Sequence, residues 1–416
     1  MIDLFIEGIS HNGEGIARNA GKVIFIPYTI PGETVQAIIS EDKTQYSRGI
    51  LKDIILKSPY RVKAKCPYYY HCGGCSYQHV DYQQQLLLKQ RIVEDALKRI
   101  GGVSTVVKPL IGMPEPWNYR NKVIWHLAQS DNGINMGFYK FRSNEIVDIY
   151  QCPLLLPGLN EVSLIIREML HELEIREKTS IVIRQSNQQN DVMIEFINCL
   201  PKKILLKELS KKVQSIYVQQ QGKLRLLFGK REIVQKAGHC LFTICPQNFF
   251  QTNSEQSERL IEIVCQYLNL SDSADILDAY CGVGMFSINI AQDACRVTGV
   301  DSNHSSIKNA RRNAKINGLT NCQFIAGFCE KILLTLEKRF SRVIVDPPRA
   351  GLEKEFITRI LPITSELIVY VSCNPATLAR DIKQFVTHHC QLIEVQPLDM
   401  FPQTGNIENI ALLQKD

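Results

Sequence analysis

The stretch Asp275-Ile276-Leu277-Asp278-Ala279-Tyr280-Cys281-Gly282-Val283-Gly284 decides the fold of this chain. An apolar, strand-like run over residues 275–279 leads into a glycine loop, and a helix-like segment follows at 286–291. Glycines at such a turn let the backbone approach a ligand closely. An acid, Asp301, closes the next strand-like run, where its carboxylate can hold ribose hydroxyls. The pattern predicts a nucleoside-type ligand at the carboxyl end of a parallel sheet.

The glycine loop is incomplete as a dinucleotide fingerprint. A full fingerprint reads Gly-x-Gly-x-x-Gly, whereas this chain has only Gly282 and Gly284, with Asp278 four residues before the first of them. That pattern disfavours a pyrophosphate and suits S-adenosylmethionine, so we expect these three residues at the cofactor. The alternative is a tight turn that binds nothing, and the loop alone does not decide between the two.

Strand-like and helix-like segments alternate regularly from about Pro246 onward. Near-continuous apolar strands separated by helices are typical of a parallel, doubly wound sheet. The sequence therefore predicts an α/β, Rossmann-like domain over residues 237–416. Its expected elements are helix 254–268, strand 275–279, helix 286–291, strand 297–300, helix 305–317, strands 342–345 and 366–371, and helix 376–388.

Two further domains are expected in front of it, because 416 residues exceed what one hydrophobic core usually supports. Residues 1–57 alternate short strand-like runs with turns containing Gly and Pro, which predicts a small β-barrel. Residues 58–236 mix both patterns and predict an α+β domain. Either the amphipathic helix 81–100 belongs to this central domain or it packs on the C-terminal one. Its apolar positions at helical spacing are Leu86, Leu87, Val93, Ala96, Leu97 and Ile100.

The composition is that of an ordinary globular protein, with 45% hydrophobic and 22% charged residues. Lys and Arg outnumber Asp and Glu by 48 to 42, which permits a nucleic-acid partner without requiring one. The 14 cysteines and the lack of a signal-peptide pattern favour a reducing compartment. No apolar run reaches the roughly 18 to 20 residues that span a bilayer. We expect a cytoplasmic, soluble protein with no membrane partner, and a monomer, although nothing in the sequence determines the oligomeric state.

A cysteine lies between a predicted strand and a predicted helix in Val371-Ser372-Cys373-Asn374-Pro375. Asn374 is a good N-cap, and Pro375 fits the first helical position. Cys373 therefore lies at the positive end of a helix dipole, which is expected to lower the pKa of its thiol. One interpretation is a nucleophile. The other is a buried cysteine that only packs.

Asp346-Pro347-Pro348-Arg349 follows another predicted strand, at the edge where open α/β sheets bind ligands. Asp-Pro-Pro followed by an aromatic residue would indicate methylation of an exocyclic base amine, with the aromatic ring stacked on the base. Arg349 occupies the aromatic position here. The motif therefore points away from N-methylation and towards a reaction that needs a nucleophile.

Methylation of C5 of uracil is such a reaction, because this carbon is a poor nucleophile. A thiolate must add to C6 to produce an enolate that attacks an electrophilic methyl group, and a base must then remove the C5 proton. Cys373 is the candidate thiolate. Glu408, which precedes the apolar strand 410–413, is the candidate base, although a Glu at the start of a strand is usually solvated.

Together, Cys373-Asn374-Pro375, Asp346-Pro347-Pro348-Arg349 and Phe401-Pro402-Gln403-Thr404-Gly405-Asn406-Ile407-Glu408 resemble the RNA uracil-5-methyltransferases, in particular those acting on 23S ribosomal RNA. The resemblance covers essentially the whole chain. It implies methylation of C5 of a uridine through a covalent adduct of Cys373 with C6, with Glu408 as the base. The positions that it implies for contact with S-adenosylmethionine are Gln251, Tyr280, Asp301 and Asp346.

The chain departs from the family pattern at three positions. The family commonly has His two residues before the catalytic Glu, where this chain has Asn406. The position that often holds Asp or Asn near the adenine corresponds to Phe328, which weakens a cofactor assignment at that point. Asp301 replaces the usual Glu, which keeps the carboxylate but shortens its reach.

Three cysteines cluster at Cys66, Cys72 and Cys75, and Cys152 is the natural fourth ligand of a metal. Read without the family, the set suits a four-thiolate zinc site and an iron–sulfur cluster about equally. The spacing resembles the [4Fe-4S] motif of this family, which favours the cluster. We expect it to have a structural or RNA-orienting role rather than a redox role.

The N-terminal segment resembles the TRAM domain, an OB-like RNA-binding barrel, in residues 7–18, Phe25-Ile26-Pro27 and Pro31-Gly32-Glu33. A single-stranded or looped uridine is the expected target, because C5 and C6 must enter a pocket. The leading hypothesis is a 23S ribosomal RNA enzyme, and a transfer RNA enzyme is its nearest rival. A non-catalytic RNA-binding or ribosome-assembly factor is the alternative of another class. The intact set of Cys373, Glu408 and Asp346 argues against it.

Overall fold

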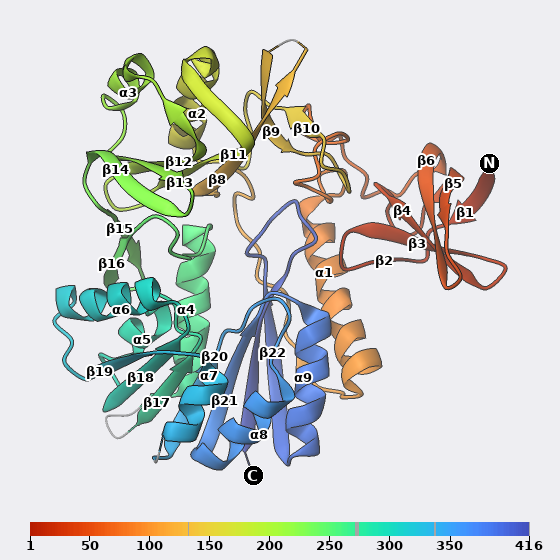
Figure 1. The fold of residues 1–416 in the computed structure, drawn as a ribbon. Helices are drawn as coiled ribbons and strands as arrows, with labels where there is room; N and C mark the ends of the chain where they lie inside the picture. The colour runs from red at the N-terminus through yellow and green to blue at the C-terminus, as the bar shows by residue number, and fades with distance from the viewer. Residues whose placement is uncertain (132, 271–273, 337, 416) are drawn as a thin grey trace.

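A computed structural model describes residues 1–131, 133–270, 274–336 and 338–415. Its largest layer is an eight-stranded sheet in the order β19-β18-β17-β20-β21-β23-β22-β7 (Figure 1). The first five of these strands run parallel. The strands are β7 (Val106–Val107), β17 (Asp275–Ala279), β18 (Arg296–Asp301), β19 (Cys322–Ala326), β20 (Phe340–Val345), β21 (Thr364–Ser372), β22 (Cys390–Leu398) and β23 (Glu408–Lys415).

The expectation of a wholly parallel sheet is wrong at its C-terminal edge. β23 runs antiparallel to both of its neighbours, β21 and β22. The physical reason is the connection: β22 and β23 are joined by loop 399–407, which contains no crossover helix. Strands joined in that way pair antiparallel. This hairpin matters for function because its loop leads directly into Glu408.

Helices cover both faces of the sheet, as in a doubly wound fold (Figure 1). One face packs on α4 (Ser254–Leu268), α5 (Met285–Ile290) and α6 (His304–Ile316). The other packs on α8 (Lys354–Ile363), α9 (Pro375–Thr387) and the short α7 (Cys329–Ile332). The strands are therefore buried from both sides, which explains the near-continuous apolar runs in their sequences.

A further helix on this second face comes from far earlier in the chain. α1 (Tyr82–Ala96) continues as a π-helical turn to Gly101 and ends at Gly102, which has φ +65°. Val93 and Leu97 belong to the same core as α8 and α9. Figure 1 shows α1 beside α9, so the helix packs on the C-terminal domain, one of the two placements left open by the sequence.

The buried face of α1 differs from the expected one. Leu87 is 52% exposed and Ile100 is 44% exposed, although both have helical spacing with the apolar stripe. Gln85 and Lys89 are buried in their place. Their side chains bond to loop 399–407, and these polar contacts, rather than hydrophobic spacing alone, determine which face of the helix turns inward.

The central domain is built on a seven-stranded sheet in the order β10-β9-β8-β11-β12-β13-β14, with α2 (Pro157–Glu168) and α3 (Lys203–Leu209) packed on its core. A separate hairpin, β15 (Ile233–Ala237) and β16 (Cys240–Ile244), joins the core of the C-terminal domain. The expected boundary at 236/237 thus falls inside this hairpin. The sheet strands are β8 (Lys122–Ser130), β9 (Gly133–Tyr139), β10 (Ile146–Asp148), β11 (Leu173–Gln185), β12 (Val192–Pro201), β13 (Ser215–Gln220) and β14 (Lys223–Gly229).

The N-terminal domain is a six-stranded sheet in the order β1-β5-β6-β4-β3-β2, which encloses a small apolar core and projects to one side (Figure 1). Arg142 of the central domain donates to Glu14 of this domain at 2.9 Å. None of the helices in the described ranges is long and apolar enough to cross a membrane. The strands are β1 (Ile2–Phe5), β2 (Gly8–Ile9), β3 (Glu14–Asn19), β4 (Lys22–Pro27), β5 (Thr34–Asp42) and β6 (Tyr46–Leu56).

Candidate active site

Cys373 lies where β21 ends and α9 begins, as the sequence predicts. The Asn374 side chain caps the helix by accepting from the backbone N–H of Ala376 at 3.1 Å, and Pro375 occupies the first turn. The local sequence therefore determines the sharp turn that presents the thiol. Cys373 itself is only partly buried.

Arg349 links three segments around the thiol. Its guanidinium lies beside the Cys373 thiol, whose pKa it lowers, and its Nη2 donates to Oδ1 of Asn406 at 3.2 Å. Its carbonyl oxygen accepts from Asn374 Nδ2 and Thr377 Oγ1, both at 3.3 Å. In the sequence Arg349 pointed only away from N-methylation. The structure gives it direct contact with the candidate nucleophile, and its replacement of an aromatic residue after Asp-Pro-Pro was the available signal.

Burial raises the pKa of the Cys373 thiol. The carboxyl groups of Glu408 and Asp346 raise it further, while the positive charge of Arg349 opposes them. The expectation that the helix end would lower this pKa is therefore wrong, because desolvation and two nearby acids outweigh the helix dipole. The thiol becomes a thiolate only when a proton acceptor or additional positive charge is nearby.

Glu408 begins β23 and is only 4% exposed, so the interpretation of a solvated surface acid is wrong. Burial raises the pKa of its carboxyl well above the usual range, and Asp346 raises it further against the opposing charge of Arg349. The Glu408 carboxyl therefore ionises less readily than an exposed glutamate. Asp346 and Arg349 act on the Glu408 carboxyl and also on the Cys373 thiol, so the fold brings the two candidate catalytic residues to one site.

The glycine loop and Asp301 form one unit at the ends of β17 and β18. Gly282 and Gly284 have φ values of +55° and +87°, in the left-handed region that favours glycine. Asp301 Oδ2 accepts from the Gly282 N–H at 2.9 Å, and its Oδ1 accepts from the Asn303 N–H at 2.7 Å. The carboxylate is therefore held in place by the loop on one side and by the start of α6 on the other.

Two acids at the strand ends, Asp278 and Asp346, have strongly raised pKa values. Burial raises the pKa of Asp278 to about 7 and that of Asp346 to about 7, and in each case a neighbouring acid adds to the shift. Asp278 is fully buried, and its Oδ2 accepts from the N–H and the hydroxyl of Ser287 at 3.0 and 2.5 Å. Its Oδ1 is buried with no partner among the described residues. Asp278 thus anchors the start of α5, directly behind the glycine loop.

A cavity of about 620 Å³ opens beside this loop. Tyr280 and Phe328 line it, and the Tyr280 hydroxyl donates to Oε1 of Glu330 at 2.7 Å. Phe328 is 62% exposed. Gln251 lies elsewhere, in the segment before α4, where its side chain is buried and its carbonyl accepts from the Asn121 amide at 3.2 Å. The cavity is large enough for a nucleoside-sized ligand.

All four clustered cysteines line a single cavity of about 260 Å³ in the central domain. Cys66, Cys72 and Cys75 come from the segment before α1, and Cys152 from the loop after β10. Burial raises the pKa of the Cys152 thiol to about 11. Burial also raises the pKa of the Cys75 thiol, and the nearby Cys152 raises it further. In the ranges that the structure describes, no group of three or more His, Cys, Asp or Glu is placed to hold a metal ion.

The chain is similar to known proteins over almost its whole length. The tRNA (uracil-5-)-methyltransferase family model matches residues 202–416, and the TRAM domain model matches residues 2–52. An uncharacterised RNA methyltransferase of Halalkalibacterium halodurans is 36% identical over 443 residues, covering 100% of this chain and 97% of the relative. An uncharacterised RNA methyltransferase of Caldanaerobacter subterraneus is 36% identical over 440 residues, covering 99% of this chain and 97% of the relative.

A solved structure is similar over almost the whole length. It is the Pyrococcus abyssi tRNA (uracil-54, C5)-methyltransferase in complex with S-adenosyl-L-homocysteine, with a TM-score of 0.79 and 29% identity. The similarity covers 99% of this chain and 100% of that one. The chain therefore belongs to the RNA uracil-5-methyltransferase family, with a TRAM domain in front of an S-adenosylmethionine-dependent methyltransferase domain.

Proposed function

We propose that this enzyme methylates C5 of a uridine in 23S ribosomal RNA through a covalent adduct of Cys373 with C6. The observation that carries the proposal is the shared environment of Cys373 and Glu408, which interact with the same Asp346 and Arg349. A nucleophile and a base close to each other are what C5 methylation requires, whereas amine methylation needs no protein nucleophile.

The residues divide the reaction into two halves. Cys373 forms a sulfur–C6 bond, and Arg349 favours the thiolate that attacks. S-adenosylmethionine supplies the methyl group that C5 of the resulting enolate accepts. Glu408 then takes the C5 proton, the electrons of that bond form the C5–C6 double bond, and the sulfur–C6 bond breaks with its electron pair returning to Cys373.

The strand ends suit a positively charged cofactor. Asp278 raises the cost of ionising Asp346, and Asp301 raises that of Asp278, so a sulfonium or ammonium group nearby would relieve the repulsion among these acids. The left-handed glycine loop and the neighbouring cavity provide room for a nucleoside. The residues that we propose for cofactor binding are Gln251, Tyr280, Asp301, Asp346, Asp278, Gly282 and Gly284.

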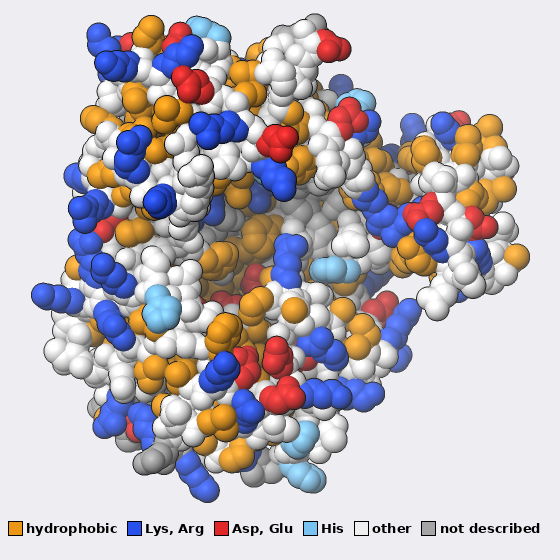
Figure 2. All heavy atoms as spheres, in the orientation of Figure 1, with side chains coloured by type: hydrophobic (Ala, Val, Ile, Leu, Met, Phe, Trp, Pro, Cys, Tyr) orange, Lys and Arg blue, Asp and Glu red, His pale blue; other side chains and the backbone are white. Residues whose placement is uncertain are grey.

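The choice of RNA rests on the accessory parts of the chain. The TRAM domain and the cysteine set support the ribosomal target, while the similarity to a transfer RNA enzyme of Pyrococcus abyssi favours transfer RNA as a second candidate. Figure 2 shows a hollow on one face between the domains, with Lys and Arg side chains around it. Such a positively charged hollow suits a folded RNA, whether ribosomal RNA or transfer RNA.

The target is tested by supplying the purified enzyme with labelled S-adenosylmethionine and unmodified transcripts of 23S ribosomal RNA and transfer RNA. We expect 5-methyluridine to form in the ribosomal transcript, identified by nuclease digestion and mass spectrometry. Methylation of transfer RNA alone would replace the ribosomal proposal with its rival. Binding of RNA without methylation of either would support the assembly-factor alternative instead.

For the cysteine set we propose a [4Fe-4S] cluster held by Cys66, Cys72, Cys75 and Cys152. A zinc ion draws four thiolates to about 2.3 Å from one point. The cysteines here line one cavity of about 260 Å³ instead. A cubane of iron and sulfide fills more space than one ion, so the donor set and the cavity fit the cluster better.

Protein purified without oxygen is expected to contain about four iron and four sulfide per chain. Cys75→Ser should lose most of this iron because one ligand is removed. Cys265→Ser is the matched control, because Cys265 is a partly buried thiol that does not line the cavity. Stoichiometric zinc without iron in the wild type would overturn the cluster assignment.

A further inference from the structure

Three polar side chains occupy the inward face of α1. Tyr82, Gln85 and Lys89 follow the spacing i, i+3 and i+7, which places them on one side of a helix. Gln85 is 1% exposed and Lys89 is fully buried. Burying an ammonium group is unfavourable unless it is paired and hydrogen-bonded, so this face requires a specific partner.

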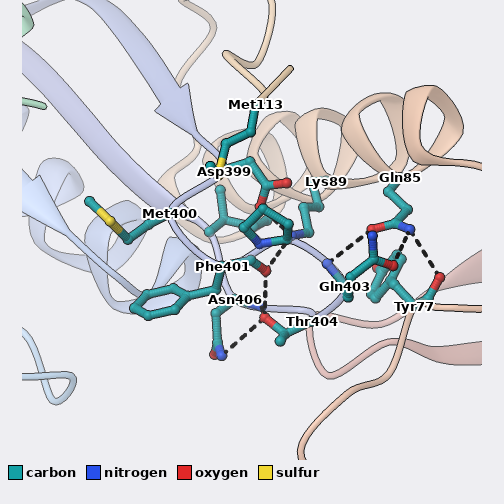
Figure 3. A network of polar contacts seen from close by, with 12 residues as sticks. Tyr77, Gln85, Lys89, Met113, Asp399, Met400, Phe401, Gln403, Thr404 and Asn406 are labelled. Atoms are coloured by element: carbon teal, nitrogen blue, oxygen red, sulfur yellow. Dashed lines mark hydrogen bonds and ion pairs between the residues drawn. The ribbon is translucent and has the colours of Figure 1, made fainter. Parts of the chain in front are cut away.

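That partner is loop 399–407, more than 300 positions away in the sequence. Lys89 Nζ donates to Oδ1 of Asp399 at 2.6 Å and to the carbonyl oxygen of Phe401 at 3.2 Å. The Tyr82 hydroxyl donates to the other oxygen of Asp399 at 2.9 Å. Figure 3 shows Lys89 and Gln85 pointing from the helix towards the loop. The first part of the loop is therefore held by an ion pair shielded from water.

The middle of the loop is held by Gln85. The Gln85 Nε2 donates to Oε1 of Gln403 at 3.0 Å, and the Gln403 N–H donates to Oε1 of Gln85 at 3.2 Å. The carbonyl oxygen of Gln403 accepts from the N–H groups of Ser76 and Tyr77 at 3.1 and 3.0 Å. Gln403 has φ +69°, a left-handed conformation that costs a non-glycine residue energy and persists only where its surroundings impose it.

The far end of the loop reaches the catalytic residues. Asn406 accepts from Arg349, which contacts Cys373, and Glu408 is the first residue after the loop. A Cβ placed on Gly405 would lie 2.6 Å from the carbonyl oxygen of His11, so the N-terminal domain also packs closely against the loop. A shift of this loop therefore moves Glu408 and Asn406 relative to the thiol.

We propose that Gln85 and Lys89 are positioning residues, which hold loop 399–407 so that Glu408 can take the C5 proton. This inference rests on the proposed function, because it assigns the two residues to the second half of that reaction. A buried ion pair is often no more stabilising than apolar residues of similar size. The gain from burying Lys89 against Asp399 is the fixed location of the loop.

The test compares Gln85→Leu with Gln83→Leu, the same change at an exposed position of the same helix. A second variant, Lys89→Met with Asp399→Leu, removes the ion pair without leaving a charge buried alone, and Lys98→Met is its exposed control. A displacement of about 1 Å can cost on the order of 10²-fold in rate. We expect product release to slow by that order in the two test variants, with the covalent RNA complex accumulating on ordinary RNA.

Adduct formation is expected to stay within a few-fold of the wild type, as is the KM for S-adenosylmethionine. Unchanged release in both test variants would overturn the inference, and so would an equal loss of adduct formation and release. If one test variant does not fold, as judged by circular dichroism, the other carries the test. Failure of the wild type to form any adduct with 5-fluorouridine RNA would instead remove the proposed function on which the inference rests.

Discussion

Replacing Cys373 by alanine is expected to reduce methyl transfer to background, a loss on the order of 10⁴- to 10⁶-fold. The reason is chemical: without the thiolate, C5 of uracil has no enolate character with which to attack a methyl group. Substrate binding should change little, because the residue is small and only partly buried. Transfer of a labelled methyl group to RNA measures the loss directly.

The adduct itself is measured with RNA that contains 5-fluorouridine. Fluorine at C5 cannot leave as a proton, so the wild type should become trapped as a covalent complex that survives denaturing electrophoresis. Cys373→Ala should form none, and Cys295→Ala, which alters an exposed cysteine, should behave as the wild type. A complex that persists in Cys373→Ala would remove this residue from the role of nucleophile.

Replacing Glu408 by glutamine is expected to stop the reaction after methyl transfer. The amide keeps the shape of the side chain but does not accept a proton, so the C5 proton stays and the sulfur–C6 bond persists. Turnover should fall by about 10²- to 10⁴-fold, the usual contribution of a general base. The covalent complex should accumulate on ordinary RNA, where the wild type shows little.

The pH dependence of release gives an independent check of the Glu408 role. Burial and Asp346 raise the pKa of the Glu408 carboxyl, so its ionisation is displaced to higher pH than that of an exposed glutamate. Only the ionised form accepts a proton, and the ionised fraction increases as the pH rises towards the raised pKa. We therefore expect release by the wild type to accelerate from neutral to alkaline pH. Equal acceleration in Glu408→Gln, or free turnover by that variant, would assign the base to another group.

Much of the fold follows from local sequence. The strand at 275–279, the glycine loop and the helices 254–268 and 376–388 are found within a few residues of their expected places. The Cys373 turn is also local, because a cap at Asn374 and Pro375 at the first helical position determine it wherever the chain is located. Candidate residues could therefore be named from the sequence, and the pattern of alternating strands predicted the edge of the sheet where they meet.

The sequence by itself thus determined the type of domain, the location of the thiol at a helix start and the identity of the chemical groups. Only the tertiary structure decided that Glu408 is buried, that the pKa of Cys373 is raised, that β22 and β23 run antiparallel, and that Gln85 and Lys89 face inward. Each of these depends on groups distant in the chain, as the pairs 85–403 and 89–399 show. Capping and strand formation act between neighbouring residues, whereas desolvation, ion pairing and loop placement depend on which segments the completed fold brings together.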